Sequence, residues 1–211
     1  MIKVGKIAVN LFQTNTYFLY DDTKEAIIID PGCSNKDEEN EIVSFIKEKG
    51  LKPVRLINTH CHIDHILGNK FVSKKYKLEL EAHKDEELNR TNSDENASQF
   101  GLPQPQSPKI SKYLDEGDVI KFGNSQLRVL FTPGHTAGHI TLVSDEDKFI
   151  ICGDVLFNDS IGRTDLPGGD YDVLTKSIKT KLFTLDDDFI VYPGHYRDTT
   201  IGKEKVSNPY L

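Results

Sequence analysis

Three histidines and an aspartate lie within one short segment, THCHIDH at residues 59–65. Imidazole and carboxylate groups are ligands that zinc, iron and manganese sites use. The candidate metal ligands in this segment are His60, His62, Asp64 and His65. One open catalytic metal needs about four ligands, one of them a water. Four groups from a single loop therefore favour two metals about 4 Å apart, with further ligands from elsewhere in the chain.

The segment before these ligands, PVRLIN at residues 53–58, reads as a short buried strand. In an extended backbone, side chains two positions apart point the same way. The first two histidines are therefore predicted to face one side of the chain, and Cys61 the opposite side, into packing. Asp64 is expected on the side of the histidines if the extension persists, and His65 in the first turn of a following helix.

Three more candidate ligands each follow a β-like run and a turn that contains glycine. The motifs are FTPGHTAGH, IICGDVLF and IVYPGH, and the candidate residues are His135, Asp154 and His195. Glycine allows the backbone to approach a site closely, and loops at strand ends often hold such groups. His139 is expected to support the site without binding metal, and His83 to lie at the surface. Cys152 stays open as a zinc ligand, because it precedes an aspartate by two positions on a predicted strand.

Patterns along the chain predict strands, then helices, and then the same order again. Strands are expected at KIAV, TYFLY, AIIID, PVRLIN, LELEAH, VIKF, QLRVLF, ITLV, KFIIC and FIVY. Helices are expected at 35–49, 65–76, 84–99, 170–183 and 200–206, the fourth with Val173, Leu174, Ile178 and Leu182 inward. This order suggests two β-rich halves packed as a sandwich with helices outside. Residues 101–118 are expected to form an exposed loop between the halves. Because site residues lie on both sides of that loop, residues 1–211 are expected to form a single domain.

Composition and charge exclude several partner classes. The chain carries 26 Lys and Arg against 33 Asp and Glu, a net charge of −7, without a basic cluster, so no nucleic-acid partner is expected. The apolar runs are short, whereas a membrane span needs about 18 apolar residues, so no membrane partner is expected. The first ten residues lack the apolar region of a signal peptide. Three cysteines cannot all pair. We therefore expect a cytoplasmic protein with free thiols and a small-molecule substrate; the oligomeric state stays open.

Taken in order, THCHIDH, PGHTAGH, CGDVLF and YPGH resemble the motifs of the metallo-β-lactamase superfamily over almost the whole chain. DVLFNDSIGRTDLPGGDY and TIGKEKVSNPYL resemble its short, glyoxalase II-like hydrolases. The resemblance implies an α/β fold, a four-layer αβ/βα sandwich, with a dinuclear metal site. By that pattern the first metal is held by His60, His62 and His135, the second by Asp64, His65 and His195, and Asp154 bridges both. Asp30 matches a position that usually has a structural role.

The same resemblance implies a thioesterase of glyoxalase II type that acts on small 2-hydroxyacyl thioesters through a hydroxide bridging two divalent metal ions. Zinc is the expected metal, with iron and manganese as alternatives. Two cations lower the pKa of a bridging water to about 7 and stabilise the developing oxyanion. Asp64 is the catalytic residue expected to orient the hydroxide. Arg163 is a candidate for binding a substrate carboxylate, unless it pairs with Asp165 or Asp159. Tyr196 is a second candidate substrate contact.

Two other hypotheses stay open beside the hydrolase. The motifs also resemble those of the persulfide dioxygenases of the superfamily. That resemblance implies a mononuclear iron enzyme whose ligands are at the positions of His60, His135 and Asp154. Cys61 is typical of these dioxygenases, whereas Gly194 is typical of the hydrolases. The third hypothesis is a metal-stabilised binding module without catalysis.

Two comparisons with family patterns narrow the expected substrate. The β-lactamases of the superfamily tend to lack the Asp64–His65 pair and to have cysteine in place of Asp154, so that activity is not expected. Glyoxalase II carries a C-terminal helical extension with basic residues for glutathione, whereas this sequence ends at Leu211. Glutathione thioesters are therefore expected to bind weakly.

Overall fold

Two six-stranded sheets form the centre of the computed structural model, which describes residues 1–99 and 101–211 in full and Phe100 by its backbone alone. The first sheet has its strands in chain order: β1 (Lys3–Val9), β2 (Thr14–Tyr20), β3 (Glu25–Ile29), β4 (Lys52–Ile57), β5 (Leu80–Ala82) and β6 (Ile110–Tyr113). The pairs β1–β2 and β2–β3 are antiparallel, and β3 to β6 are parallel. The parallel strands therefore all end at the same edge.

The second sheet has the order β14-β13-β10-β9-β8-β7. Its strands are β7 (Val119–Phe122), β8 (Ser125–Phe131), β9 (Ile140–Ser144), β10 (Phe149–Gly153), β13 (Ile190–Pro193) and β14 (Thr199–Thr200). A separate small hairpin joins β11 (Leu156–Phe157) to β12 (Ser160–Ile161). Because β10 and β13 are parallel neighbours, the residues that follow them lie side by side.

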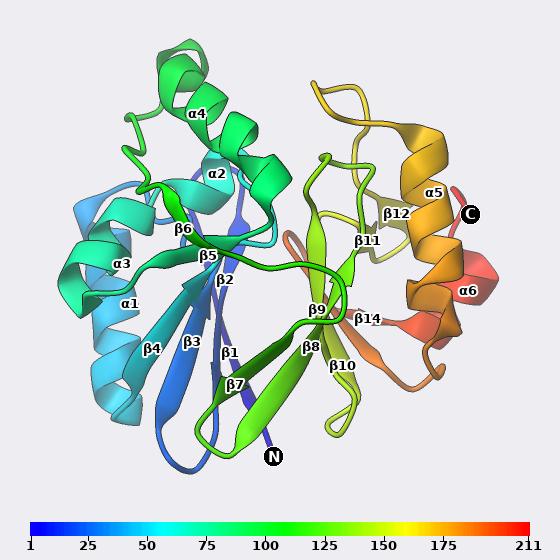
Figure 1. Ribbon diagram of the computed structural model, residues 1–211, viewed down its shortest axis with the longest axis horizontal. Coiled ribbons are helices and arrows are strands. Elements are labelled where there is room, and N and C mark those ends of the chain that lie inside the picture. Colours follow the sequence, from blue (N-terminus) through cyan, green and yellow to red (C-terminus); the bar gives the residue numbers. More distant parts are fainter.

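Helices cover the outer faces of both sheets and the edge at which the parallel strands end (Figure 1). They are α1 (Lys36–Lys49), α2 (Ile63–Ile66), α3 (Asn69–Tyr76), η1 (Lys84–Glu86), α4 (Glu87–Asn96), η2 (Ala97–Phe100), α5 (Tyr171–Thr180), η3 (Leu182–Thr184) and α6 (Ile201–Ser207). Figure 1 shows α1 and α3 outside the first sheet, and α5 and α6 outside the second. The layers therefore run helix, sheet, sheet, helix, which confirms the predicted αβ/βα sandwich. No helix in the fully described part of the chain is long and apolar enough to cross a membrane.

Strand alternation divides the core into three layers. On β2, Tyr17 and Leu19 pack between the sheets, whereas Phe18 packs toward the helices of the first half. On β10, Ile151 points between the sheets and Ile150 toward the helices of the second half. Such strands are buried on both faces, which explains why they read as continuous apolar runs rather than alternating ones.

Capping residues at both ends determine where α1 begins and ends. The Asn35 side chain accepts hydrogen bonds from the first turn of α1, and Gly50 ends the helix at φ 66°. Ile42 and Ile46, four positions apart and so on one face of the helix, are buried. On α5, however, the prediction that Val173 points inward was wrong, because it is 38% exposed.

Three predicted segments differ in the structure. The helix expected at 65–76 is divided into α2 and α3, because the amide of Gly68 donates to the Pro31 carbonyl (2.7 Å) outside the helix. The extension expected through Asp64 ends at His62, the residue before α2. The loop expected at 101–118 contains β6, which pairs with β5 although only its first residue is buried. A strand held mainly by backbone pairing leaves little trace in the sequence.

Candidate metal centre

The predicted ligands converge at one edge of the sandwich, where several strands of both sheets end. His60 and His62 follow β4, while Asp64 and His65 lie on the single turn of α2. The other three, His135, Asp154 and His195, follow β8, β10 and β13. The structure therefore brings together all seven side chains that the sequence predicted as metal ligands.

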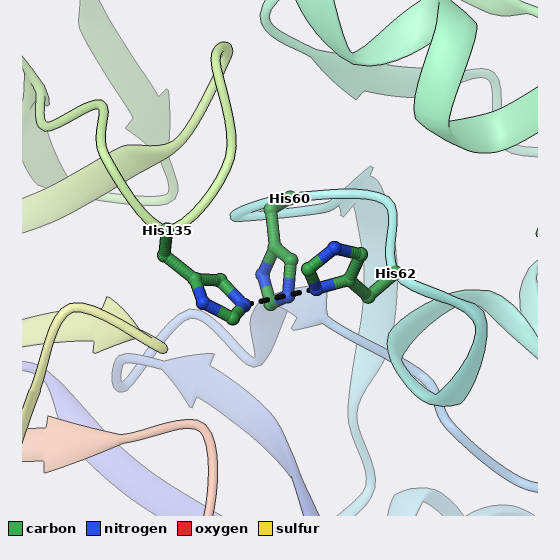
Figure 2. A group of neighbouring side chains, drawn as sticks. All are labelled: His60, His62 and His135. Atoms are coloured by element: carbon green, nitrogen blue, oxygen red, sulfur yellow. Dashed lines mark hydrogen bonds between the residues drawn. The ribbon is translucent and has the colours of Figure 1, made fainter. Parts of the chain in front are cut away.

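His60, His62 and His135 form the first group (Figure 2). Nδ1 of His62 lies 2.9 Å from Nε2 of His135, and one nitrogen of each ring lies within 4.8 Å of the other two. Burial lowers the pKa of His60 well below its ordinary value, and burial with the nearby His135 lowers that of His62 to about 3. The imidazoles of His60 and His62 therefore stay neutral at pH 7, which is the form that binds metals.

Asp64, His65 and His195 form the second group. Nε2 of His195 lies 3.2 Å from Oδ2 of Asp64, and Nε2 of His65 lies 3.5 Å from the same oxygen. A cation held here would have one carboxylate and two imidazoles as ligands.

The Asp154 carboxylate lies between the two groups. Its Oδ2 is 3.6 Å from Nε2 of His135 and 3.3 Å from Nε2 of His195, and its Oδ1 is 3.5 Å from Nε2 of His65. A Cβ at Gly194 would come within 2.0 Å of Oδ1 of Asp154, so only glycine leaves room for this carboxylate. One carboxylate thus contacts members of both groups.

Charges in the second group are strongly coupled. Burial alone would raise the pKa of Asp64, but the neighbouring His65 and His195 lower it to about 2. Burial likewise would lower the pKa of His195, but Asp154 and Asp64 raise it to about 10. The carboxylates are therefore anionic and hold protons on adjacent imidazoles. A divalent cation can replace those protons without leaving the carboxylates unpaired.

Buried atoms without partners test whether metal ions fit this site. Nε2 of His60 and Oδ1 of Asp154 are buried and have no hydrogen-bond partner among the described residues. A buried polar atom without a partner costs about 1–3 kcal/mol, so native structures seldom leave one. A cation between the groups would satisfy both atoms, so the donor set fits divalent metal ions.

The opposite ring nitrogens of three histidines are held by oxygen acceptors. Nδ1 of His135 donates to the Arg163 carbonyl (2.7 Å), Nδ1 of His195 to the Phe12 carbonyl (2.9 Å), and Nδ1 of His65 to Oδ2 of Asp30 (3.1 Å). These contacts direct the Nε2 lone pairs into the site. Asp30 also accepts hydrogen bonds from the amide and hydroxyl of Thr59 (2.8 and 2.6 Å), which agrees with its predicted structural role.

Glu86 is a site residue that the sequence did not indicate. It is fully buried, and its carboxylate accepts hydrogen bonds from the Cys61 amide (2.7 Å), the Gly138 amide (3.0 Å) and the Thr136 hydroxyl. Cys61 lies between two ligands and Thr136 follows a third. Glu86 therefore ties together the two loops that form the first group. Because Glu86 lies in the charged segment KDEELNR, it reads as a surface residue. The one sequence feature that could have indicated a site residue is its position just after β5.

Other predicted residues have mixed outcomes. His139 supports the site as expected, because its Nε2 accepts from the Asp154 amide (3.1 Å). His83 is buried rather than at the surface, stacked on Phe131 with ring centroids 4.5 Å apart, so that prediction was wrong. Cys61 points into the core between the first sheet and its helices, as predicted. Cys152 packs in the core between the second sheet and its helices and belongs to neither ligand group.

Arg163 and Tyr196 both line the cleft above the ligands, which measures about 710 Å³. The Arg163 guanidinium forms a bidentate pair with Asp165 (2.7 and 2.7 Å), the alternative that the sequence left open. Tyr196 is 74% exposed at the rim. A role for either in substrate binding stays a prediction.

Comparison with known proteins identifies the family of the chain. The family model of the metallo-beta-lactamase superfamily matches residues 9–195. The hydroxyacylglutathione hydrolase GloC of Haemophilus influenzae is 39% identical over 97% of this chain and 96% of its own length. The human mitochondrial persulfide dioxygenase ETHE1 is 30% identical over 94% of this chain and 71% of its own length.

Solved structures share the whole fold. A crystal structure of the B3 metallo-beta-lactamase BLEG-1 has a TM-score of 0.89 and 32% identity, and the match covers 99% of each chain. A crystal structure of TTHA1623 in a di-iron-bound form has a TM-score of 0.88 and 31% identity, and the match covers 98% of this chain and 100% of that one. Motifs, fold and ligand geometry therefore agree, and the chain belongs to the metallo-β-lactamase superfamily as a metal-dependent hydrolase.

Proposed function

We propose that the protein uses two divalent metal ions to hydrolyse small 2-hydroxyacyl thioesters. Zinc is the metal that we propose first. The observation that carries the proposal is the Asp154 carboxylate, whose oxygens contact both ligand groups. The first metal would be held by His60, His62 and His135, the second by Asp64, His65 and His195, and Asp154 would serve both. Similarity to GloC supports a thioester substrate. The di-iron form of TTHA1623 supports a dinuclear centre and keeps iron as an alternative metal.

Metal ions bound at this site would supply hydroxide at neutral pH and polarise the thioester carbonyl. Asp64 positions the attacking water. Its Oδ2 accepts a hydrogen bond from the Thr14 hydroxyl (2.8 Å), and Oδ1 has no hydrogen bond to any described residue. With its pKa held at about 2, Asp64 stays an acceptor throughout the neutral range. The departing thiolate, with an ordinary pKa of about 8.5, needs no general acid.

Arg163 and Tyr196 are proposed substrate contacts at the mouth of the cleft. The Arg163 side chain would exchange Asp165 for a carboxylate on the acyl group of the substrate, since both pairs have the same bidentate geometry. The Tyr196 ring lies 6.1 Å from the Phe157 ring, so the two aromatic side chains can pack against an acyl or thiol group together.

The reaction is tested by offering the purified protein lactoyl-glutathione, a simpler lactoyl thioester and glutathione persulfide, with thiol release and an oxygen electrode as readouts. We expect thiol release from the thioesters without oxygen uptake. Asp64→Asn should lower kcat about 100-fold or more, because it removes both a carboxylate ligand of the second group and the acceptor that orients the attacking water.

The relationship to ETHE1 defines the opposite result. Oxygen uptake with the persulfide, one iron per chain and no thiol release from either thioester would replace the thioesterase by a dioxygenase.

A further inference from the structure

One wall of the cleft is a row of neutral polar side chains on α4 and η2. The residues are Asn89, Asn92, Ser93, Asn96 and Gln99. Their spacing of three and four positions places those on α4 on one face of the helix. The charged residues Arg90 and Asp94 of the same helix lie 3.5 Å from each other and do not line the cleft. The helix therefore presents amides, rather than charges, to a bound substrate.

Most side chains of this row form hydrogen bonds within the protein, whereas Asn92 keeps its full hydrogen-bonding capacity. The Ser93 hydroxyl donates to the Cys61 carbonyl (2.9 Å), which holds α4 against the ligand loop. The side-chain amide of Asn96 donates to the backbone carbonyl of Asn92 (2.8 Å). The Asn92 carboxamide itself makes no hydrogen bond to any described residue. A carboxamide has both donor and acceptor atoms, so Asn92 can bind a ligand amide reciprocally.

The remaining walls of the cleft are largely apolar. They include Phe12, Phe157, Leu166, Pro167 and Tyr196. Figure 1 shows α4 rising on one side of this edge and the segment between β12 and α5 on the other. A substrate arm between them would meet amides on one side and apolar surface on the other.

Cations are scarce around the cleft. Among its described lining residues, Arg163 is the one Lys or Arg side chain, and Asp165 pairs with it. The chain as a whole carries a net charge of −7. A thiol arm with several carboxylates would therefore find little to neutralise it here.

We infer that the cleft selects thioesters whose thiol arm is uncharged and carries amide groups, which is the chemistry of a pantetheine arm. The inference rests on the proposed thioesterase function. Asn92 would give one hydrogen bond to an amide of the arm and accept one from it, while the methylene groups pack on the apolar side. The same arm occurs in free pantetheine and, joined to an anionic nucleotide, in coenzyme A.

The test compares one acyl group on three arms: the lactoyl thioesters of pantetheine, coenzyme A and glutathione. We expect the wild-type KM for the pantetheine thioester to be at least about fivefold below that for glutathione. Asn92→Ala should raise the pantetheine KM about 3- to 10-fold, the effect of losing one or two hydrogen bonds, with metal content unchanged. Asn40→Ala, on the exposed face of α1, is the matched control and should change nothing. If the coenzyme A thioester has a KM equal to or below that of the pantetheine thioester, the cleft accepts the nucleotide and coenzyme A is a source of the arm. A much higher KM for the coenzyme A thioester assigns the arm to a free thiol.

An Asn92→Ala variant with unchanged KM, or equal wild-type KM for pantetheine and glutathione thioesters, would overturn the inference. Wild-type protein that hydrolyses none of the thioesters would instead overturn the proposed function. In that case calorimetry with free pantetheine on the metal-loaded wild type and on Asn92→Ala still decides whether the amide row binds the arm.

Discussion

At the scale of single residues, Glu86 has the largest predicted effect outside the ligands. Glu86→Gln replaces one acceptor oxygen by a donor that faces either the Cys61 amide or the Gly138 amide and Thr136 hydroxyl. We expect metal affinity to fall about 10- to 100-fold, as for other groups that orient ligands, with the larger loss from the histidine group that Glu86 supports. Elemental analysis after dialysis against a weak chelator measures this. Glu95→Gln, on the exposed side of α4, is the control, and equal metal retention in both variants would refute a positioning role.

The three cysteines allow a second prediction at this scale. Burial raises the pKa of Cys33 and Cys152 to about 12, and burial with the nearby Glu86 raises that of Cys61 well above its ordinary value. Because the folded thiols stay protonated at pH 8, they lack the reactive thiolate. We expect no cysteine to react with a thiol reagent in the folded protein and all three to react in denaturant. Rapid labelling of the folded protein would contradict the buried positions.

At the scale of elements, Asp21 joins the turn after β2 to the turn between β7 and β8. Its carboxylate accepts from the amides of Thr23 (2.9 Å) and Asn124 (2.7 Å) and from the Ser125 hydroxyl (2.9 Å). Burial would raise the pKa of Asp21, but these hydrogen bonds lower it to about 2. The stabilisation is therefore complete above the unfolded pKa of about 3.9 and is lost as the pH falls from about 4 toward 2.

Asp21→Asn should accordingly lower the free energy of unfolding at pH 7 by about 1–3 kcal/mol and leave metal content unchanged. The adjacent Asp22 is exposed and pairs with Lys3, so Asp22→Asn should cost little. Denaturant unfolding of both variants checks the difference. Equal stability of the two would show that the link between the turns contributes nothing.

How far the sequence predicts each element depends on how local its cause is. The segment THCHIDH predicts its own site, because the strand before it and the turn after it decide where the side chains point. The strands β2 and β10 are predicted by apolar runs that are buried on both faces. By contrast, β6 depends on pairing with β5, and the burial of His83 depends on Phe131 of the other sheet. Glu86 depends on two loops distant in the chain. Such contacts arise only when the halves pack together.

At the scale of the whole molecule, the site depends on the packing of the two halves. The first sheet supplies the ligands of THCHIDH and the second supplies His135, Asp154 and His195. The two sheets also bind each other next to the site: the Asn15 amide donates to the Gly194 carbonyl (2.7 Å) and the Tyr17 hydroxyl to the Pro193 carbonyl (2.7 Å). Metal ions held between the halves would therefore stabilise the sandwich as well as catalyse.

The most direct test of the central claim, two metals with Asp154 between them, is the metal content per chain of protein purified without added metal. We predict about two ions in the wild type, about one in His195→Ala, which lacks a ligand of the second group, and the largest loss in Asp154→Ala. His139→Ala, which contacts the Asp154 amide rather than a metal, should retain most of its metal. One ion per chain in the wild type, with His195→Ala unchanged, or equal retention in Asp154→Ala and His139→Ala, would contradict the dinuclear centre.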